Sequence, residues 1–352
     1  MRYVLVKHLK PGMVVARPFY NKNLNILLNE GKEIEHWHIT SLERIGQRGI
    51  YIHDEFSNEI QVVPIIDDKS KLIFAGAVNE VFEGVSKAIS PGHGSLRDII
   101  KKLIEQVTEN QGTIVNMLDL KQFDDYTFQH SINVCILAIV VGIGLNYNEK
   151  TLENLALSAV YHDIGKLRIP LIILNKPGKL DEREFEIMKQ HPALGVEYLK
   201  GIGELNSFIE MGVLHHHERF DGTGYPAALR GKRISEFARI IALVDAFDAI
   251  TSKRSYKEAY LPSEAIEYIM ANANIHFDYD IAKIFLSKVA AYPEGLVVEL
   301  SNGLIGIVVK NYENFPTRPT IKVISKNMTE PTKYIHLHNP DSLALTVTRI
   351  VA

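Results

Sequence analysis

Six histidines and several aspartates within residues 126–257 form a pattern that suits metal binding. They lie in the stretches YTFQH, HDIGK, HP, HHHERFDGTGYP and DAFDA. Imidazoles and carboxylates without thiolates make a nitrogen and oxygen site suited to iron, manganese or zinc in an open geometry. The chain has 14 histidines but one cysteine, so a closed structural site built from cysteines is excluded. The pattern therefore predicts a metal site suited to phosphate chemistry.

Apolar periodicity assigns the first of these residues to two helices. We expect residues 124–145 to form a largely apolar helix that carries His130 near its start. A second helix is predicted over 148–165, with His162 and Asp163 in its last turn. Neighbouring side chains on a helix point about 100° apart. An adjacent histidine and aspartate therefore suit two ions side by side, with the carboxylate able to bridge them.

The remaining candidate ligands lie at helix ends or on one helix face. His191 comes just before Pro192, at a predicted break in a helix where a ligand can be directed. A further helix over 204–217 is expected to end in three consecutive histidines and to enter a glycine-containing loop. The helix after that loop carries Asp245 and Asp248 on one face, one turn apart.

These motifs resemble the HD-GYP family, a subgroup of the HD phosphohydrolase superfamily. The resemblance spans about residues 120–290 and rests on HDIGK at 162–166, HHERFDGTGYP at 216–226, DAFDAITSKRSYK at 245–257 and HFDYDIAKIF at 276–285. It implies an all-helical catalytic domain. In that family a binuclear or trinuclear iron or manganese centre hydrolyses the bacterial second messenger cyclic di-GMP.

The resemblance also implies the roles of individual residues. We divide seven metal ligands between two ions: His130, His162 and Asp245 for one, His191, His216 and His217 for the other, and Asp163 bridging both. His215 lies outside the family pair and is interpreted as a helix-terminal or solvated histidine. The family pattern implies substrate contacts at Asp248, Arg254 and Lys257, and at Gly224, Tyr225 and Pro226 of the loop, whose alternative role is to shape that loop.

Two adjacent ions would supply the chemistry without a protein nucleophile. A water that bridges them becomes a usable hydroxide near neutral pH, and the ions neutralise the nonbridging phosphate oxygens. We assign catalytic roles to Asp163 and to Lys166, which lies just beyond the HD pair and is placed to meet the phosphate as a point charge.

The expected number of ions depends on one position. Family members with a third metal carry a glutamate four residues before the first histidine, and here that position is Tyr126. A phenol that titrates near pH 10 is a poor ligand for a divalent ion. We therefore predict two divalent ions, with iron as the first expectation and manganese as the alternative.

Composition predicts a cytoplasmic enzyme of two or three domains, since the chain has 352 residues. The longest apolar run, 134–145, is about twelve residues and too short for a membrane span. The N-terminus lacks the apolar stretch of a signal peptide, and Cys135 has no disulfide partner. A net charge of −3 excludes a broad cationic surface, so we expect neither a nucleic acid polymer nor a membrane as partner.

Changes in periodicity predict a mainly α chain of four segments. These are a small α+β regulatory domain at 1–64, a helical linker at 65–118, the HD-type catalytic domain at 119–290 and a short β appendage at 291–352. Apolar faces of the linker helices predict a homodimer.

Two other functions stay open at this point. One is a sensor that binds cyclic di-GMP, or a diguanylate cyclase domain as partner, without turnover. The other is hydrolysis of a different cyclic dinucleotide, such as cyclic GMP-AMP. The sequence also leaves open whether the final product is the linear pGpG or GMP.

Overall fold

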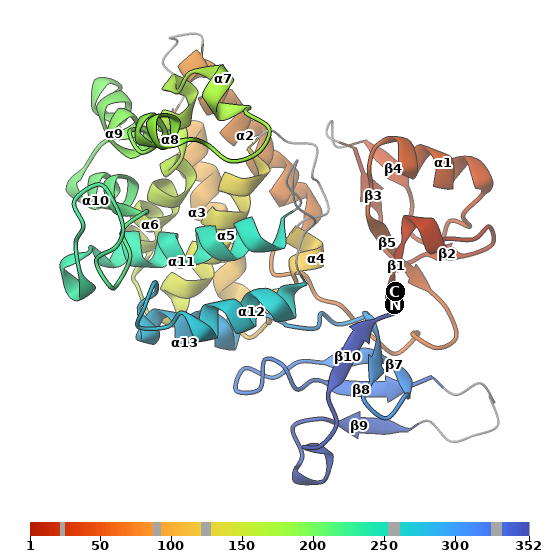
Figure 1. The fold of residues 1–352 in the computed structure, drawn as a ribbon. Coiled ribbons are helices and arrows are strands. Elements are labelled where there is room, and N and C mark those ends of the chain that lie inside the picture. Colours follow the sequence, from red (N-terminus) through yellow and green to blue (C-terminus); the bar gives the residue numbers. More distant parts are fainter. Residues whose placement is uncertain (22–24, 87–92, 121–127, 253–260, 325–332, 352) are drawn as a thin grey trace. The chain divides into compact units, whose positions relative to one another are not determined.

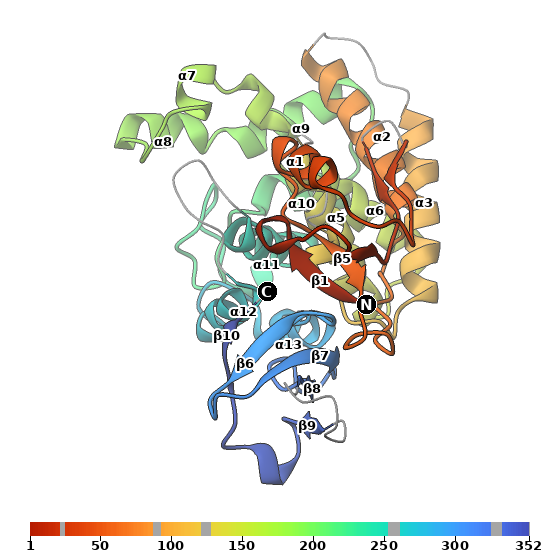
Figure 2. The ribbon, with the colours of Figure 1, turned by 90° about the vertical axis from the view of Figure 1, so that its right-hand side faces the viewer.

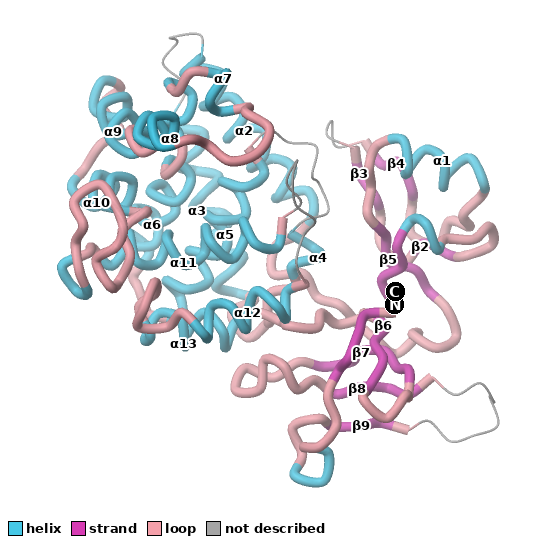
Figure 3. Tube along the Cα trace, viewed as in Figure 1, coloured by secondary structure: helices cyan, strands magenta, loops and turns pink. Residues whose placement is uncertain are grey.

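The computed structural model describes residues 1–352 except 22–24, 87–92, 121–127, 253–260, 325–332 and 352. The described chain forms two compact units (Figures 1 and 2). The terminal unit comprises 1–69, 112–125 and 286–352, and the helical unit comprises 70–111 and 126–285. Helices dominate, and short strands occur near both ends of the chain (Figure 3). This arrangement confirms the prediction of a mainly α protein with small sheets at its N- and C-terminal ends.

The helical unit is built around one apolar helix. Its helices, some of which extend a few residues past its bounds, are α2 (Asp68–Ser86), α3 (His93–Glu109), α5 (Gln129–Gly144), α6 (Glu149–Tyr161), α7 (Leu171–Leu174), α8 (Glu182–Met188), α9 (His191–Gly201), α10 (Ser207–His215), α11 (Glu236–Thr251), α12 (Pro262–Ala271) and α13 (Tyr279–Lys288). Residues 131–142 of α5 are all buried, against α6 and α11 among others. A Cβ at Gly142 would lie 2.7 Å from Leu152 Cδ2, so glycine lets α5 and α6 approach closely.

Side-chain caps fix where the helices around the site begin. Asn148 Oδ1 accepts the backbone N–H of Thr151 at 2.9 Å, and Asn206 and Ser235 cap α10 and α11 in the same way. Each cap satisfies a backbone donor that the first turn of a helix leaves unpaired. The caps therefore fix the residue at which each of these three helices begins.

The helix that precedes the HD pair is shorter than predicted. It ends at Tyr161, with His162 as its C-cap, and Ile164–Arg168 continue as a 3-10 turn. Glycine is needed within this turn, because a Cβ at Gly165 would lie 1.9 Å from the carbonyl oxygen of His191. The chain tightens at this point so that its backbone can contact the start of α9.

The apolar face of α3, which was expected to pair with a second protomer, is covered within its own chain. In α3, the apolar side chains of Leu96, Ile100 and Leu103 are at most 1% exposed. This helix packs against α5 and α6 of its own chain. The apolar periodicity of α3 therefore reflects packing within the helical unit.

The terminal unit combines the two ends of the sequence. Its N-terminal part has a three-stranded antiparallel sheet of order β1-β5-β2, a β3-β4 hairpin and helix α1; its C-terminal part is a five-stranded antiparallel sheet of order β10-β6-β7-β8-β9. The bounds are β1 Arg2–Leu5, β2 Val14–Val15, β3 Phe19–Tyr20, β4 Ile26–Leu28, α1 His36–Arg44, β5 Gly49–His53, α4 Met117–Leu120, β6 Val297–Leu300, β7 Ile305–Lys310, β8 Thr320–Val323, β9 Tyr334–His336 and β10 Val347–Ile350.

The two parts of the terminal unit share a hydrophobic core. Tyr3 and Tyr51 from the N-terminal sheet cluster with Val297 and Ile307 from the C-terminal sheet. The backbone N–H of Tyr3 also donates to the carbonyl oxygen of Gly295 at 3.0 Å. The segments at the beginning and end of the chain are thus parts of one compact unit.

Among the described helices of the protein, none combines the length and apolar character that crossing a bilayer requires.

Candidate metal centre

The helical unit brings the seven predicted ligands together in two groups. His130, His162 and Asp245 form one group, and Asp163, His191, His216 and His217 form the other. Within each group, one ligand atom from each residue lies within 4.8 Å of the others. These are the same two sets that the sequence analysis assigned to two ions, with Asp163 counted in the second. They come from the ends of α5, α6, α9 and α10 and from the middle of α11.

Three of the histidines are held by the same kind of hydrogen bond. Nδ1 of each donates to the backbone carbonyl three residues earlier, at 2.7 Å for His162, 2.8 Å for His191 and 2.7 Å for His216. Donation to a carbonyl requires the proton on Nδ1, so Nε2 of each ring carries a free lone pair. This is the usual way in which a protein orients a histidine that binds a metal through Nε2.

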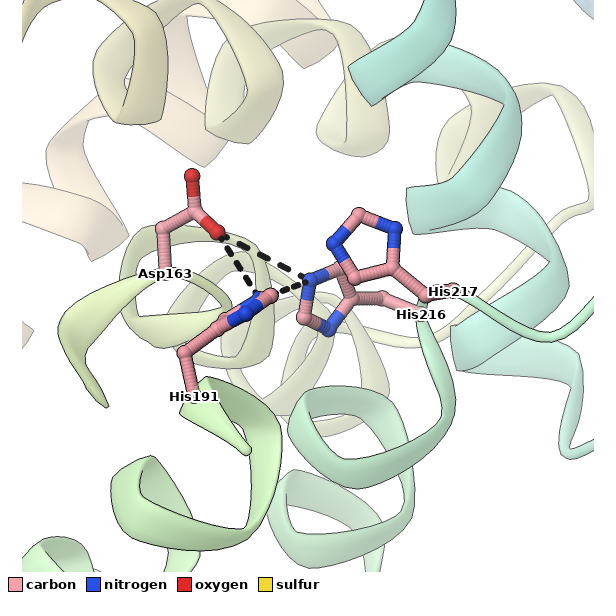
Figure 4. Close-up of side chains that lie close together, drawn as sticks. All are labelled: Asp163, His191, His216 and His217. Atoms are coloured by element: carbon pink, nitrogen blue, oxygen red, sulfur yellow. Dashed lines mark hydrogen bonds and ion pairs between the residues drawn. The ribbon is translucent and has the colours of Figure 1, made fainter. Parts of the chain in front are cut away.

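The positions of these Nε2 lone pairs suit binding of a shared ion better than hydrogen bonding between the rings. Nε2 of His191 lies 3.3 Å from Nε2 of His216, although neither atom has a proton to donate (Figure 4). Two nitrogen ligands of one ion, each about 2.1 Å from it, lie roughly 3.0–3.4 Å apart. Within the described chain, Nε2 of His162 and Oδ1 of Asp163 are buried without a hydrogen-bond partner. Such atoms are costly unless they coordinate something.

Asp163 faces both groups through different oxygens. Its Oδ1 lies 3.3 Å from Nε2 of His191 and 3.7 Å from Nε2 of His216. Its Oδ2 lies 3.4 Å from Nε2 of His162 and 4.0 Å from Nε2 of His130. One oxygen toward each ligand group is the arrangement of a carboxylate that bridges two ions.

His130 lies between two carboxylates. Its Nε2 is 2.9 Å from Asp245 Oδ1, and its Nδ1 donates to Asp248 Oδ2 at 2.7 Å. Burial lowers the pKa of His130, but the hydrogen bonds and charges of the two aspartates outweigh burial and raise that pKa to about 10. Burial likewise acts against ionised Asp245, yet His130 holds the pKa of Asp245 far below its usual range. An ion bound at Nε2 would take the place of the His130 proton.

The second group is electrostatically suited to neutral imidazole ligands. Burial lowers the pKa of His216 to about 4 and the pKa of His217 well below its ordinary value. Burial opposes ionisation of Asp163, but the positive charge of Lys166 holds the pKa of Asp163 well below its usual range. Metal binding requires neutral imidazoles and ionised carboxylates, which this environment favours. His215 belongs to neither group, and burial lowers its pKa.

The structure shows contacts of Asp248 that the sequence did not predict. The family resemblance implies that its carboxylate contacts substrate. The side chain is instead fully buried, with Oδ2 accepting from His130 and Oδ1 accepting from Asn133 Nδ2 at 2.9 Å. It therefore has no exposed edge for a base. Sequence reasoning missed Asn133, although it lies three residues after His130 and so near the same helix face.

Lys166 lies beside the ligands. Its Nζ is 2.5 Å from Asp163 Oδ2, and about a third of its side chain is exposed, at 34%. The ammonium is thus close to the bridging carboxylate and still reachable from solvent. Arg254 and Lys257, which the sequence analysis assigns to substrate, and Tyr126, on which the expected ion count depends, lie outside the described residues.

The GYP loop is folded tightly against the end of α10. The carboxylate of Glu218, 3% exposed, accepts the backbone N–H of Ala227 at 2.7 Å and of Leu229 at 3.0 Å. A Cβ at Gly224 would lie 2.3 Å from the backbone nitrogen of Arg219, so this close approach requires glycine. Glu218 is a second residue that sequence reasoning missed; its place directly after the histidine pair is the available signal.

The other two loop residues differ in exposure. Tyr225 is partly buried, and its ring lies against His217, with ring centroids 4.8 Å apart. Pro226 is exposed. Tyr225 therefore contacts a ligand of the second group, whereas Pro226 faces solvent.

Comparison with known proteins identifies the family. Residues 103–281 match the HD domain family, and residues 297–341 match the KOW domain associated with HD domain. A cyclic di-GMP phosphodiesterase from Pseudomonas aeruginosa is 37% identical over 239 residues, which cover 68% of this chain and 57% of that protein. A 3'3'-cGAMP-specific phosphodiesterase from Vibrio cholerae is 41% identical over 126 residues, which cover 36% of this chain and 24% of that protein.

A solved structure shows the same fold. The HDG"Y"P protein Bd1817 from Bdellovibrio bacteriovorus aligns with a TM-score of 0.50 and 17% sequence identity, over 80% of this chain and 97% of that one. The chain therefore belongs to the HD domain family, and its HDIGK and GYP motifs assign it to the HD-GYP group. It spans little more than half the length of the Pseudomonas relative.

Proposed function

We propose that this protein is a metal-dependent phosphodiesterase that hydrolyses cyclic di-GMP. The observation that carries the proposal is Asp163, whose two oxygens face two separate groups of histidine and aspartate ligands. This donor set suits a pair of divalent ions. The substrate follows from the HD-GYP assignment and from the activity for which the Pseudomonas relative is named.

The two ions, when bound, supply an activated water and neutralise phosphate charge. Asp163 links the two ligand groups, and buried His162, His191 and His216 present fixed lone pairs that need no rearrangement on binding. We assign Lys166 to the phosphate: its ammonium is close to the centre and partly exposed, so it can turn from Asp163 to a nonbridging oxygen.

The finer proposals concern the metal, the product and the surroundings. We propose two ions, iron first and manganese as the alternative, because nitrogen and oxygen donors without thiolate suit both. We propose pGpG as the first product, with further hydrolysis to GMP as a second step. A cytoplasmic location agrees with the single, buried Cys135.

The partners and the domain division also remain proposals. We propose a homodimer, which would use a surface other than the buried apolar face of α3, and a diguanylate cyclase domain as a partner. We keep the division into 1–64, 65–118, 119–290 and 291–352 as a proposal about sequence modules. Arg254 and Lys257 are proposed to grip the second phosphate or a guanine. Sedimentation of the purified protein measures the dimer directly.

The test is anaerobic purification with metal analysis, followed by chromatography of cyclic di-GMP digests. We expect about two ions per chain and release of pGpG by the wild-type protein, with both lost in His162→Ala. His215→Ala is the matched control, because it changes a neighbouring histidine that belongs to neither ligand group. Metal-loaded protein that binds cyclic di-GMP without cleaving it would make the protein a sensor and refute the proposal.

A second substrate is favoured by one comparison. The Vibrio relative is named for cyclic GMP-AMP and is 41% identical over the aligned residues. Digests should therefore include 3'3'-cyclic GMP-AMP beside cyclic di-GMP at equal concentration. A higher kcat/KM for the mixed dinucleotide would assign it as the substrate.

A further inference from the structure

In the described structure, partly buried His217 is held differently from the two buried histidines of its group, His191 and His216. Within the described part of the chain, neither of its ring nitrogens forms a hydrogen bond, whereas His191 and His216 each donate Nδ1–H to a backbone carbonyl. Its ring lies 4.1 Å from that of His216, centroid to centroid, and 5.0 Å from that of His191. These neighbours are themselves candidate ligands. Another group must fix the direction of its lone pair.

We propose that Tyr225 is the positioning residue for His217, and that its aromatic ring does the work that a hydrogen bond does for the other histidines. The two rings are stacked, with centroids 4.8 Å apart and planes inclined by 28°. Such an offset stack is a favoured geometry for two aromatic rings. The inference rests on the proposed function, since it concerns a ligand of the proposed second ion.

The loop fixes Tyr225 relative to His217 through the backbone. The N–H of Tyr225 donates to the carbonyl oxygen of His217 at 3.2 Å. The preceding Gly224 lies against the same segment, since a Cβ there would be 2.5 Å from that carbonyl oxygen. The two backbones are therefore held together, and a stacked side-chain pair is the consequence. The tight fold of the GYP loop would thus hold the ring of Tyr225 against His217.

The ring of Tyr225 also contacts a second aromatic side chain. Phe185 of α8 approaches it edge-on, with centroids 6.2 Å apart and planes at 83°. Among the described residues, the hydroxyl of Tyr225 has no hydrogen-bond partner. The contacts that hold Tyr225 thus involve its ring and backbone, so a phenylalanine would preserve them.

The test compares Tyr225→Phe with Tyr225→Leu, which keeps apolar bulk but removes the ring. Metal affinity is measured anaerobically by competition with a chelator, using Mn²⁺ and Fe²⁺ as probes. We expect the phenylalanine variant to match the wild type, and the leucine variant to bind one ion about 10- to 100-fold more weakly, as when a group that orients a ligand is lost. His217→Ala should weaken the same ion, and Tyr279→Leu, an exposed tyrosine on α13, should change nothing.

A kinetic measurement separates positioning from substrate contact. If Tyr225 positions His217, Tyr225→Leu should recover turnover at saturating metal with an unchanged KM for cyclic di-GMP, whereas the substrate contact that the family resemblance implies for Tyr225 would leave the KM raised. Tyr225→Met is a second ringless variant should leucine prevent folding, and the same loss of affinity is expected. A leucine variant with wild-type metal affinity, a phenylalanine variant as weak as leucine, or a KM that stays raised at saturating metal would each overturn this inference alone. A wild-type protein that binds no ion would instead refute the proposed function, and this inference with it.

Discussion

Replacing Asp248 by asparagine tests whether this buried carboxylate orients His130. Asparagine keeps the shape but removes the charge, and its amide group must face a donor on at least one side, because His130 and Asn133 both donate to Asp248. A hydrogen bond to a charged group contributes about 1.5–3 kcal/mol, against about 0.5–1.5 kcal/mol for a neutral one. The difference of about 1–2 kcal/mol corresponds to a roughly fivefold to thirtyfold lower affinity of the His130 group for its ion.

The assay is competitive metal binding by purified Asp248→Asn, with Asp280→Asn as the matched control. Asp280 has a side chain that is 75% exposed, so its substitution should leave metal affinity unchanged. Hydrolysis of cyclic di-GMP by Asp248→Asn should return toward the wild-type rate when metal is added in excess. The KM should stay constant throughout.

The opposite pattern would refute the structural argument. If Asp248→Asn bound metal as tightly as the wild type and its KM for cyclic di-GMP rose, Asp248 would contact the base. The sequence-based assignment would then be right, and the buried position of the carboxylate would describe a different state from the one that binds substrate.

Four further outcomes are expected. His162→Ala should lose metal and hydrolysis while His215→Ala keeps both; equal metal loss in the two would overturn the ligand assignment. Lys166→Ala should keep its metal and lose about tenfold to a thousandfold in kcat, and a normal kcat would remove it from the mechanism. Metal affinity at His130 should rise about tenfold per pH unit up to its pKa, since the ion displaces one proton below that pH, and become constant above it; a flat profile in chelator titrations would contradict this. Arg239→Ala should lower the free energy of unfolding in urea by about 3 kcal/mol, because the buried carboxylate of Asp278 loses one of its two cations, Arg239 and Lys232; a loss under about 1 kcal/mol would show that the Arg239–Asp278 ion pair is dispensable.

Sequence patterns could predict which histidines and aspartates the structure brings together, because the information is local. The HD pair, the paired histidines and Asp245 each lie in a short motif. The capping box that opens α8, in which Asp181 and Glu184 bond each other's backbone N–H groups, is readable in the same way. Helix periodicity then gives the approximate location of each ligand on a helix.

The contacts of Asp248 and Tyr225 could not be predicted in this way. The first depends on α5 and α11 packing so that Asp248 meets His130, which lies 118 positions away in the sequence. The second depends on a loop that folds back onto His217. Motif resemblance indicated that both residues matter, but not which atoms they contact. Similarly, strand periodicity at each end of the chain gave no sign that the two ends share a core.

That shared core has a consequence for synthesis of the chain. A ribosome makes β1 before the helical unit and β6 and β7 after it, so the apolar face around Tyr3 stays uncovered while the helical unit is made. Helical segments with mostly local contacts can fold during this time. Closing the terminal unit across an insertion that is already compact then costs less chain entropy than closing it across a disordered loop of equal length. Slowing formation of α5 and α6 should therefore leave the first strands exposed to aggregation for longer.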